Sequence, residues 1–267
     1  MFSKLRSLIF KLDPETAHSL AVKALKFNYF PVKNIRKSDS LKVEIFSKKL
    51  PNPIGIAAGF DKNAEVYNSL FKLGFGFVEV GTVTPIKQYG NPKPRIFRLE
   101  EDEALINRLG FNNSGSKNIS SRIKSDLPNG FLGVNIGPNK DTKNRIEDYL
   151  ICLRAFHDIA DYLTINISSP NTENLRSFHD AKELSELLDA IEIEKKKLNS
   201  SVPIAVKISP DIEVNNIDNI SELLIKYKID LAIISNTTDK NRENLNNIQK
   251  FEKGGLSGKP IEKKSNF

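Results

Sequence analysis

Six short apolar runs, each followed by a polar or glycine-bearing segment, constrain the fold more than any other feature of this sequence. The runs are residues 54–59, 77–82, 131–137, 162–168, 203–209 and 230–236. Segments with helical spacing stand between them, at residues 64–75, 145–160, 181–198 and 217–228. Apolar strands that alternate with helices are typical of a parallel sheet buried on both faces. The pattern therefore predicts an α/β fold, with residues 41–53 as an antiparallel lead-in that turns at "LPNP".

Each run ends in a signature that could face a ligand: AAGFDKN, EVGTVTP, VNIGPNK, NISSPNT, KISPD and SNTT. Functional groups at the C-terminal ends of successive parallel strands are typical of a TIM-type (β/α)8 barrel. An open doubly wound sheet gathers its ligand signature at one switch point, and no G-x-G-x-x-G follows the first run. We therefore expect a barrel domain over residues 41–267. Only six βα units are present where a closed barrel has eight, so we expect it to be incomplete at its C-terminus.

The net charge of +7 lies entirely in residues 1–50, which hold eleven Lys and Arg against four Asp and Glu. A first basic amphipathic helix is predicted from the spacing of Phe2, Leu5, Ile9 and Leu12. "LDPET" then marks a second start, with Asp13 as N-cap and Pro14 in the first turn. We expect the stripe of this second helix to be Ala17, Leu20, Ala21 and Ala24. Residues 1–40 thus form a helical extension, for which packing on the barrel and contact with lipid both remain open.

Several classes of protein and site are disfavoured by composition. Cys152 is the only cysteine, so it cannot form an internal disulfide or a cysteine-based metal site. His18, His157 and His179 lie far apart, and no metal site is expected; the last two are expected on helix surfaces. No G-x-S-x-G nucleophile elbow occurs in the sequence, so a Ser-His-Asp hydrolase is poorly supported. The basic residues stand among helical apolar positions, which favours a membrane surface over nucleic acid, and no stretch is long enough to span a membrane.

The strand-end residues suit a flat polar ligand. Amides that both donate and accept hydrogen bonds stand at Asn107, Asn135, Asn166, Asn171 and Asn236. Such groups complement a ring with alternating N–H and C=O groups, such as a pyrimidine dione or a flavin. Lys62 and Lys207 add positive charge that could meet a carboxylate or a reduced flavin. Gly59, Gly81 and Gly258 would let the backbone approach a flat ring closely.

Nine ordered motifs resemble the quinone-dependent, class 2 dihydroorotate dehydrogenases. They are AAGFDKN, VEVGTVTP, GNPKPRIFRL, INRLGFNN, GVNIGPNK, NISSPNT, VKISPD, SNTT and GGLSGKP. The resemblance implies oxidation of dihydroorotate to orotate in de novo pyrimidine biosynthesis, with FMN as cofactor and a membrane quinone as electron acceptor. By that match Ser169 is the catalytic base. Class 1 enzymes use a cysteine there, whereas Cys152 lies within a predicted helix.

The resemblance also implies binding residues. Substrate-binding positions are Lys62, Asn107, Arg108, Leu109, Gly110, Phe111, Asn166, Asn171, Asn236 and Thr237. Cofactor-binding positions are Ala58, Gly59, Phe60, Asp61, Lys62, Thr82, Asn135, Asn166, Lys207, Ser235 and Gly258. His18 and Arg98 match residues of the quinone site. A surface position for His18, and an ion pair of Arg98 with Glu100, Glu101 or Asp102, are the structural alternatives.

The expected protein is a monomeric, peripheral membrane enzyme on the cytoplasmic face of a bacterial cell membrane. The basic N-terminal helices would contact the membrane and form the quinone site. Two alternatives stay open. One is an inactive fragment, or a piece that needs a partner to complete the barrel and hold FMN. The other is a different FMN barrel that acts on a dihydropyrimidine ring, such as a dihydropyrimidine or dihydrouridine reductase.

Overall fold

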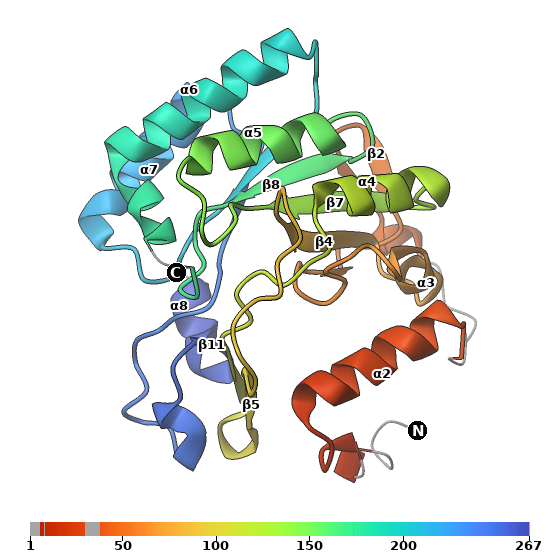
Figure 1. Ribbon diagram of the computed structural model, residues 1–267, viewed down its shortest axis with the longest axis vertical. Helices are drawn as coiled ribbons and strands as arrows, with labels where there is room; N and C mark the ends of the chain where they lie inside the picture. The colour runs from red at the N-terminus through yellow and green to blue at the C-terminus, as the bar shows by residue number, and fades with distance from the viewer. Residues whose placement is uncertain (1–5, 8, 30–37, 173, 267) are drawn as a thin grey trace.

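The six predicted runs each contain a strand, and the strands form one curled parallel sheet. The computed structural model describes residues 6–7, 9–29, 38–172 and 174–266. The strands lie in the order β10-β9-β8-β7-β4-β3, so each run is hydrogen-bonded to the next one along the chain. Their bounds are Gly55–Ile56 (β3), Phe77–Val83 (β4), Phe131–Ile136 (β7), Tyr162–Asn166 (β8), Ile204–Lys207 (β9) and Leu231–Ile233 (β10). The structure is an α/β half-barrel of TIM type (Figure 1).

Five helices pack with this sheet. Four were predicted: Tyr67–Lys72 (α3), Arg145–Phe156 (α5), Ala181–Lys197 (α6) and Val214–Lys226 (α7). The helix Ser116–Ser125 (α4) was not predicted. The side chain of Asn144 caps α5 by accepting from the N–H of Glu147, and that of Asp180 caps α6.

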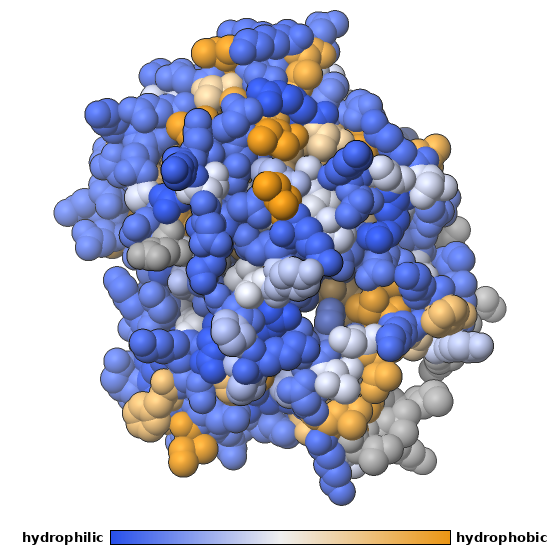
Figure 2. Space-filling view, in the orientation of Figure 1, coloured by the Kyte–Doolittle hydropathy of each residue, from blue (hydrophilic) through white to orange (hydrophobic). Residues whose placement is uncertain are grey.

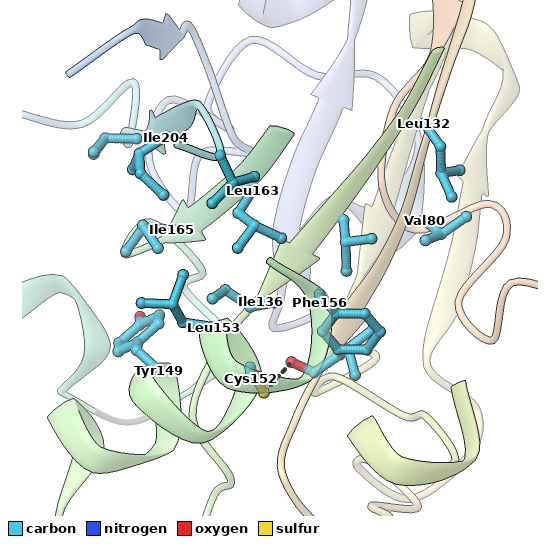
Figure 3. Packing of buried hydrophobic residues seen from close by; sticks show 14 of the residues in the cluster. Val80, Leu132, Ile136, Tyr149, Cys152, Leu153, Phe156, Leu163, Ile165 and Ile204 are labelled. Atoms are coloured by element: carbon cyan, nitrogen blue, oxygen red, sulfur yellow. Dashed lines mark hydrogen bonds between the residues drawn. The ribbon is translucent and has the colours of Figure 1, made fainter. Parts of the chain in front are cut away.

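The main core lies between the sheet and these helices. α5 buries Tyr149, Cys152, Leu153 and Phe156, a spacing that places all four on one helix face. They pack against strand residues such as Ile165, which point away from the interior of the half-barrel (Figure 3). Because side chains alternate along a strand, the residues between these core positions point into that interior. Every residue of β7 and β8 is buried, so the centre of the sheet is buried on both faces, as the apolar runs predicted.

The N-terminal ends of the parallel strands are closed by a short hairpin. Strands Val43–Ile45 (β1) and Lys48–Leu50 (β2) pair antiparallel, which confirms the expected lead-in. The hairpin turns at Phe46 and Ser47, which adopt positive φ, rather than at "LPNP", where the chain bends after β2. The ring of Phe46 stacks on Phe131, and Phe131 stacks on Tyr162. The bottom of the half-barrel is therefore filled by an apolar plug.

A second sheet, which the sequence did not predict, faces the opposite ends of the parallel strands. It consists of Ile96–Leu99 (β5), Ala104–Asn107 (β6) and Gly255–Gly258 (β11) in the antiparallel order β11-β6-β5. Its buried residues form a separate small core with Leu245. Short 3-10 helices at Asp39–Leu41, Glu100–Asp102, Leu175–His179, Ile248–Phe251 and Lys259–Ile261, and the helix Glu262–Ser265 (α8), complete the described elements. The motif GGLSGKP thus lies on and beside β11.

The helix Pro14–Lys26 (α2) begins as predicted, since the Asp13 side chain accepts a hydrogen bond from the N–H of Thr16 over 2.9 Å. Hydrogen bonds join α2 to the rest of the protein near both of its ends. Arg95 donates two hydrogen bonds to the carboxylate of Glu15, and both side chains are largely buried. At the other end, the hydroxyl of Ser69 donates to the carbonyl of Leu25. α2 therefore packs on the barrel domain.

The face of α2 that packs inward differs from the predicted stripe. Leu25 is buried and Val22 packs on the main core, whereas Leu20 is 50% exposed and Ala21 is also exposed. Phe2 and Leu5, two positions of the first predicted helix, lie outside the described residues. Within the described ranges no helix is long and apolar enough to cross a membrane.

Candidate active site

A cleft of about 480 Å³ opens where the parallel strands end and the antiparallel sheet begins. Its walls come from the ends of β4, β8 and β9 and the segments after β3, β8 and β10 on one side, and from β5, β6 and β11 on the other. Most predicted site residues line it: Ala58, Gly59, Lys62, Thr82, Asn107, Leu109, Gly110, Phe111, Asn166, Ser169, Asn171, Lys207, Ser235, Asn236 and Thr237. Gly81, expected to let the backbone approach a flat ring, lines it too, and the lining residues that sequence reasoning missed are Ala57, Ile96, Leu105, Asn112, Ser257 and Ile261.

Other predicted residues lie around the cleft rather than on it. Asp61 is buried and accepts hydrogen bonds from the N–H groups of Glu65 and Val66, so it orders the chain before α3. Arg108 points away, donating to Glu252 and to the carbonyl of Pro94. Gly258 is adjacent to the lining residue Ser257. Asn135 is fully buried beneath the lining.

Asparagines at the ends of β7 and β8 form a connected network at the cleft floor. The Asn135 side-chain oxygen accepts from the Thr82 hydroxyl over 2.7 Å and from the Asn166 amide over 3.2 Å. The Asn166 oxygen in turn accepts from the Ser168 hydroxyl over 3.0 Å. The Asn236 amide also donates to that hydroxyl, over 2.9 Å. The amides at three strand ends are thereby held in a fixed donor and acceptor order.

The segment NISSPNT places Ser169 at the cleft. Ser169 is 5% exposed, and its Oγ accepts a hydrogen bond from the N–H of Asn171 over 3.2 Å. In the described part of the chain, no ionisable side chain is hydrogen-bonded to Ser169 Oγ. A proton accepted by this hydroxyl would therefore need a relay through water.

Arg176 holds this segment in place from behind. Its guanidinium donates to the carbonyls of Ser168 and Thr237 and also pairs with Asp211. Burial opposes ionisation of Asp211, but hydrogen bonds, above all from Lys264, lower the pKa of its carboxyl to about 2. The segments after β8, β9 and β10 are thus joined by one ionic cluster.

Positive charge dominates the cleft. Lys62 and Lys207 line it, and no Asp or Glu stands among its described lining residues. Burial is the main cause that lowers the pKa of Lys62 to about 8. Its ammonium donates to the carbonyl of Gly59 over 2.6 Å. The cleft therefore favours a ligand that carries a carboxylate or another anionic group.

A second cleft of about 560 Å³ lies between α2 and the residues that follow β3. His18, Val22, Phe60 and Lys62 line it, and the His18 ring meets the Phe60 ring edge to face at 5.1 Å. Burial lowers the pKa of His18 to about 4, and the charge of Lys62 adds to this. His18 is therefore half-buried in the wall of this cleft rather than fully exposed on the helix surface. Lys62 and Asn112 line both clefts, so only one layer of residues separates them.

Arg98 lines neither cleft. It donates to the carbonyls of Phe10 and Leu12 and lies over the Phe10 ring. The alternative of an ion pair with Glu100, Glu101 or Asp102 is wrong for the described residues. Arg98 instead anchors the residues that precede α2 to β5.

The sequence also led to expectations for His179 and Cys152. His179 was expected on a helix surface, but it accepts a hydrogen bond from the N–H of Ser209, and burial lowers its pKa to about 4. Cys152 is fully buried, and burial raises the pKa of its thiol well above the usual value, which opposes a role as nucleophile. No group of three or more potential metal ligands occurs within the described ranges.

Comparison with known proteins agrees with these motifs and this fold. A family model described as dihydroorotate dehydrogenase matches residues 40–266. "Dihydroorotate dehydrogenase (quinone)" of Bartonella tribocorum is 48% identical over 97% of this chain and 73% of that protein. The protein of the same name from Nitrosomonas europaea is 44% identical, over 99% of this chain and 80% of its own.

A solved structure of ligand-free DHODH from Eimeria tenella superposes with a TM-score of 0.90 at 39% identity, over 95% of this chain and 77% of that one. A complex of DHODH from the same organism with ferulenol gives a TM-score of 0.89, over 93% and 73%. By sequence and by fold, this chain belongs to the dihydroorotate dehydrogenase family.

Proposed function

We propose that this protein oxidises dihydroorotate to orotate in pyrimidine biosynthesis, with FMN as its cofactor and a membrane quinone as its electron acceptor. One observation carries the proposal. A cationic cleft lined by Ser169 and strand-end asparagines shares Lys62 with a second cleft under α2. Two neighbouring sites suit a redox reaction in which one substrate donates electrons and a separate substrate accepts them. The names of its relatives support the same reaction.

The residues present fit a flavin. Gly59 has φ of +109°, and a Cβ added there would meet no atom within 4 Å, so it would project into open space. The backbone at Gly59 can therefore approach a flat ring without hindrance. Ala58, Thr82, Asn166, Lys207 and Ser235 would hold the ring and its substituents, with Asn135, Phe60, Asp61 and Gly258 in support. When bound, FMN supplies the acceptor for the hydride that leaves C6 of dihydroorotate.

The chain's own residues would bind and orient the substrate. Lys62 supplies positive charge for its carboxylate, while Asn107, Asn171, Asn236 and Thr237 supply donors and acceptors for the ring amides. Asn166 would contact both substrate and flavin. The backbone of Leu109, Gly110 and Phe111 closes the cleft, and Arg108 holds that segment through Glu252. Fixed geometry of this kind lowers the entropic cost of reaching the transition state.

Ser169 would take the proton from C5. A serine hydroxyl is a weak base, so it acts by passing a proton onward while negative charge on the substrate is stabilised by fixed donors. The N–H of Asn171, which donates to Ser169 Oγ, orients the hydroxyl lone pairs. We infer that a water completes the relay.

The second cleft would receive the quinone, with His18 in its wall. The surface beside it suits a membrane, since Leu20, Phe27 and Tyr29 are exposed next to Lys23 and Lys26. Figure 2 shows hydrophobic side chains among hydrophilic ones on this part of the molecule. Exposed apolar and basic side chains on and just after one helix favour the headgroup region of a membrane. We therefore propose that residues 1–40 form a quinone and membrane extension, on a monomer at the cytoplasmic face.

The test is to express the chain, record its visible absorption and assay it with dihydroorotate and a quinone. Flavin bands close to stoichiometric with protein are expected, and turnover should require the quinone rather than fumarate or NAD. Ser169→Ala should remove most turnover and keep the flavin, whereas the exposed control Ser121→Ala should change neither. A colourless protein, or one that instead acts on dihydrouracil or dihydrouridine, would refute the proposal.

A further inference from the structure

A buried carboxylate lies beneath the floor of the cleft. Glu79, in the middle of β4, is 3% exposed. Its side chain accepts hydrogen bonds from the Asn135 amide over 2.9 Å, the Tyr162 hydroxyl over 3.0 Å and the Thr164 hydroxyl over 2.7 Å. In the described part of the chain it forms no ion pair, so neutral donors alone satisfy it. Burial of a carboxylate is unfavourable unless other interactions compensate for its desolvation.

The surrounding sheet is built to satisfy this carboxylate. Tyr162 is on β8, two strands away from β4, and its ring crosses the intervening strand β7 at Gly133. A Cβ on Gly133 would lie 2.2 Å from the Tyr162 ring, so only glycine leaves room for the crossing. Burial and the neighbouring charge of Glu79 raise the pKa of Tyr162, which therefore remains a donor. Residues from β4, β7 and β8 thus converge on one acceptor.

The Glu79 carboxylate determines the orientation of the Asn135 side-chain amide. The two ends of an asparagine amide have nearly the same shape, so hydrogen-bonding neighbours determine which end faces which way. A carboxylate can only accept, so Asn135 must turn its NH2 toward Glu79 and its oxygen toward Thr82 and Asn166. Asn166 must then donate with its NH2.

The same order continues to the cleft wall. Because the Asn166 NH2 donates to Asn135, the Asn166 oxygen is left to accept from Ser168 and from the Asn236 amide. Asn166 and Asn236 both line the cleft. One buried carboxylate therefore stands at the start of a chain of directed hydrogen bonds that ends at groups facing the ligand.

We propose that Glu79 is a positioning residue that fixes the donor and acceptor order of the cleft amides, and thereby its selectivity for the pyrimidine ring. This inference rests on the proposed function for the identity of the ligand. Glu79 contacts no ligand itself, since it does not line the cleft, and it acts through Asn135. Fixing recognition groups from beneath is a general way to preorganise a binding site.

The test compares Glu79→Gln with Glu194→Gln. Both replace a buried carboxylate with an amide of equal size, but Glu194 lies on α6 and pairs with Arg154, far from the cleft network. In Glu79→Gln we expect the dissociation constant for orotate, read from the flavin absorbance shift, to rise at least tenfold. Glu194→Gln should stay within twofold of the parent protein. An unchanged orotate affinity in a folded, flavin-loaded Glu79→Gln protein would overturn the proposal.

A second measurement needs neither flavin nor orotate. Side-chain amide NMR signals of Asn135 and Asn166 should form one set in the parent protein and become doubled or exchange-broadened in Glu79→Gln. A single unchanged set would overturn the positioning role. If the parent protein failed to bind FMN while this NMR difference was present, the proposed function would fail and the positioning role would stand.

A double variant guards against poor folding of the single one. Glu79→Gln combined with Asn135→Asp moves the obligate acceptor by one residue and keeps the total charge. The new carboxylate can accept from position 79, from Thr82 and from Asn166, so the order beyond it is restored. We expect orotate affinity to recover to within about threefold of the parent protein. A double variant that binds orotate at least tenfold more weakly than the parent would overturn the proposal.

Discussion

The side-chain amide of Asn171 donates a hydrogen bond to the backbone carbonyl of Asn107 over 3.0 Å. This contact joins the segment after β8, which carries Ser169, to the end of β6 in the antiparallel sheet. The two residues are 64 positions apart in the chain, and both line the cleft. The position of the proposed base therefore depends on a sheet that belongs to another part of the fold.

Replacement of Asn171 by alanine should loosen this contact and remove a substrate contact as well. A hydrogen bond of this kind contributes about 1 kcal/mol, and a loss of 1–2 kcal/mol corresponds to roughly a 5- to 30-fold change. We expect the KM for dihydroorotate to rise by that factor with flavin content unchanged. Steady-state kinetics would measure it. Asn118→Ala, on α4, removes a similar bond to the exposed backbone carbonyl of Ser114 and should leave KM unchanged; an equal effect of both would contradict the prediction.

Replacement of Arg176 by lysine should weaken the ionic cluster behind the cleft. The guanidinium of Arg176 reaches two carbonyls and two carboxylates at once. A single ammonium cannot reproduce that planar fork. We expect a loss of about 2 kcal/mol in the free energy of unfolding, together with lower kcat. Urea denaturation would measure the first effect.

The control for Arg176→Lys is Lys124→Ala. Lys124 pairs with Asp158 on the surface, where both side chains are about half exposed. Such a pair contributes at most about 1 kcal/mol. If Arg176→Lys lowered the free energy of unfolding no more than Lys124→Ala does, the ionic cluster would not hold the segments after β8, β9 and β10 together.

The parallel sheet could be predicted because each of its strands is a local feature. An apolar run of β-branched residues, followed by a polar segment, needs no knowledge of distant partners. The antiparallel sheet could not be predicted in that way. Its strands have four residues each, and Gly255 on β11 pairs with Asn107 on β6, far away in the sequence. Only tertiary pairing makes such short segments into strands.

The site residues divide in the same way into those that could be predicted and those that could not. Residues next to the parallel strands, such as Asn166 and Lys207, line the cleft as expected. Missed residues such as Leu105 and Ser257 come from the unpredicted sheet. The helix α4 was missed because Ile119 and Ile123 are its only large apolar residues, so its periodicity is weak. The inward face of α2 was assigned wrongly because alanine and leucine dominate its other side, while the face that packs carries His18.

Stability should fall in mildly acidic solution because of His18 and His179. Burial lowers both pKa values from about 6.5 to about 4 in the folded protein. A histidine with a lowered folded pKa stabilises the fold above the unfolded pKa, and that contribution is lost as pH falls from about 6.5 to about 4. We expect the free energy of unfolding to decrease steadily across that window.

His179→Gln should flatten this dependence, because a glutamine can accept from the N–H of Ser209 without titrating. Denaturation midpoints between pH 7 and pH 4.5 would give the slope, with Ser121→Ala as a control that changes no titratable group. This range stays above the window of Asp211, whose contribution is lost only as pH falls from about 3.8 to about 2. An identical slope for His179→Gln and the control would contradict the assignment.

Gly133→Ala should destabilise the protein by forcing Tyr162 away from Glu79. The added Cβ would lie 2.2 Å from the ring, and neither strand can yield easily, because β7 and β8 are both central in the sheet. Overpacking of this kind costs about 1–3 kcal/mol. In a Tyr162→Leu background the obstructing ring is gone, so the same change should cost less than about 1 kcal/mol. The four proteins form a double-mutant cycle that urea denaturation can complete. An equal cost of Gly133→Ala in both backgrounds would mean that the crossing of Tyr162 over Gly133 does not govern this site.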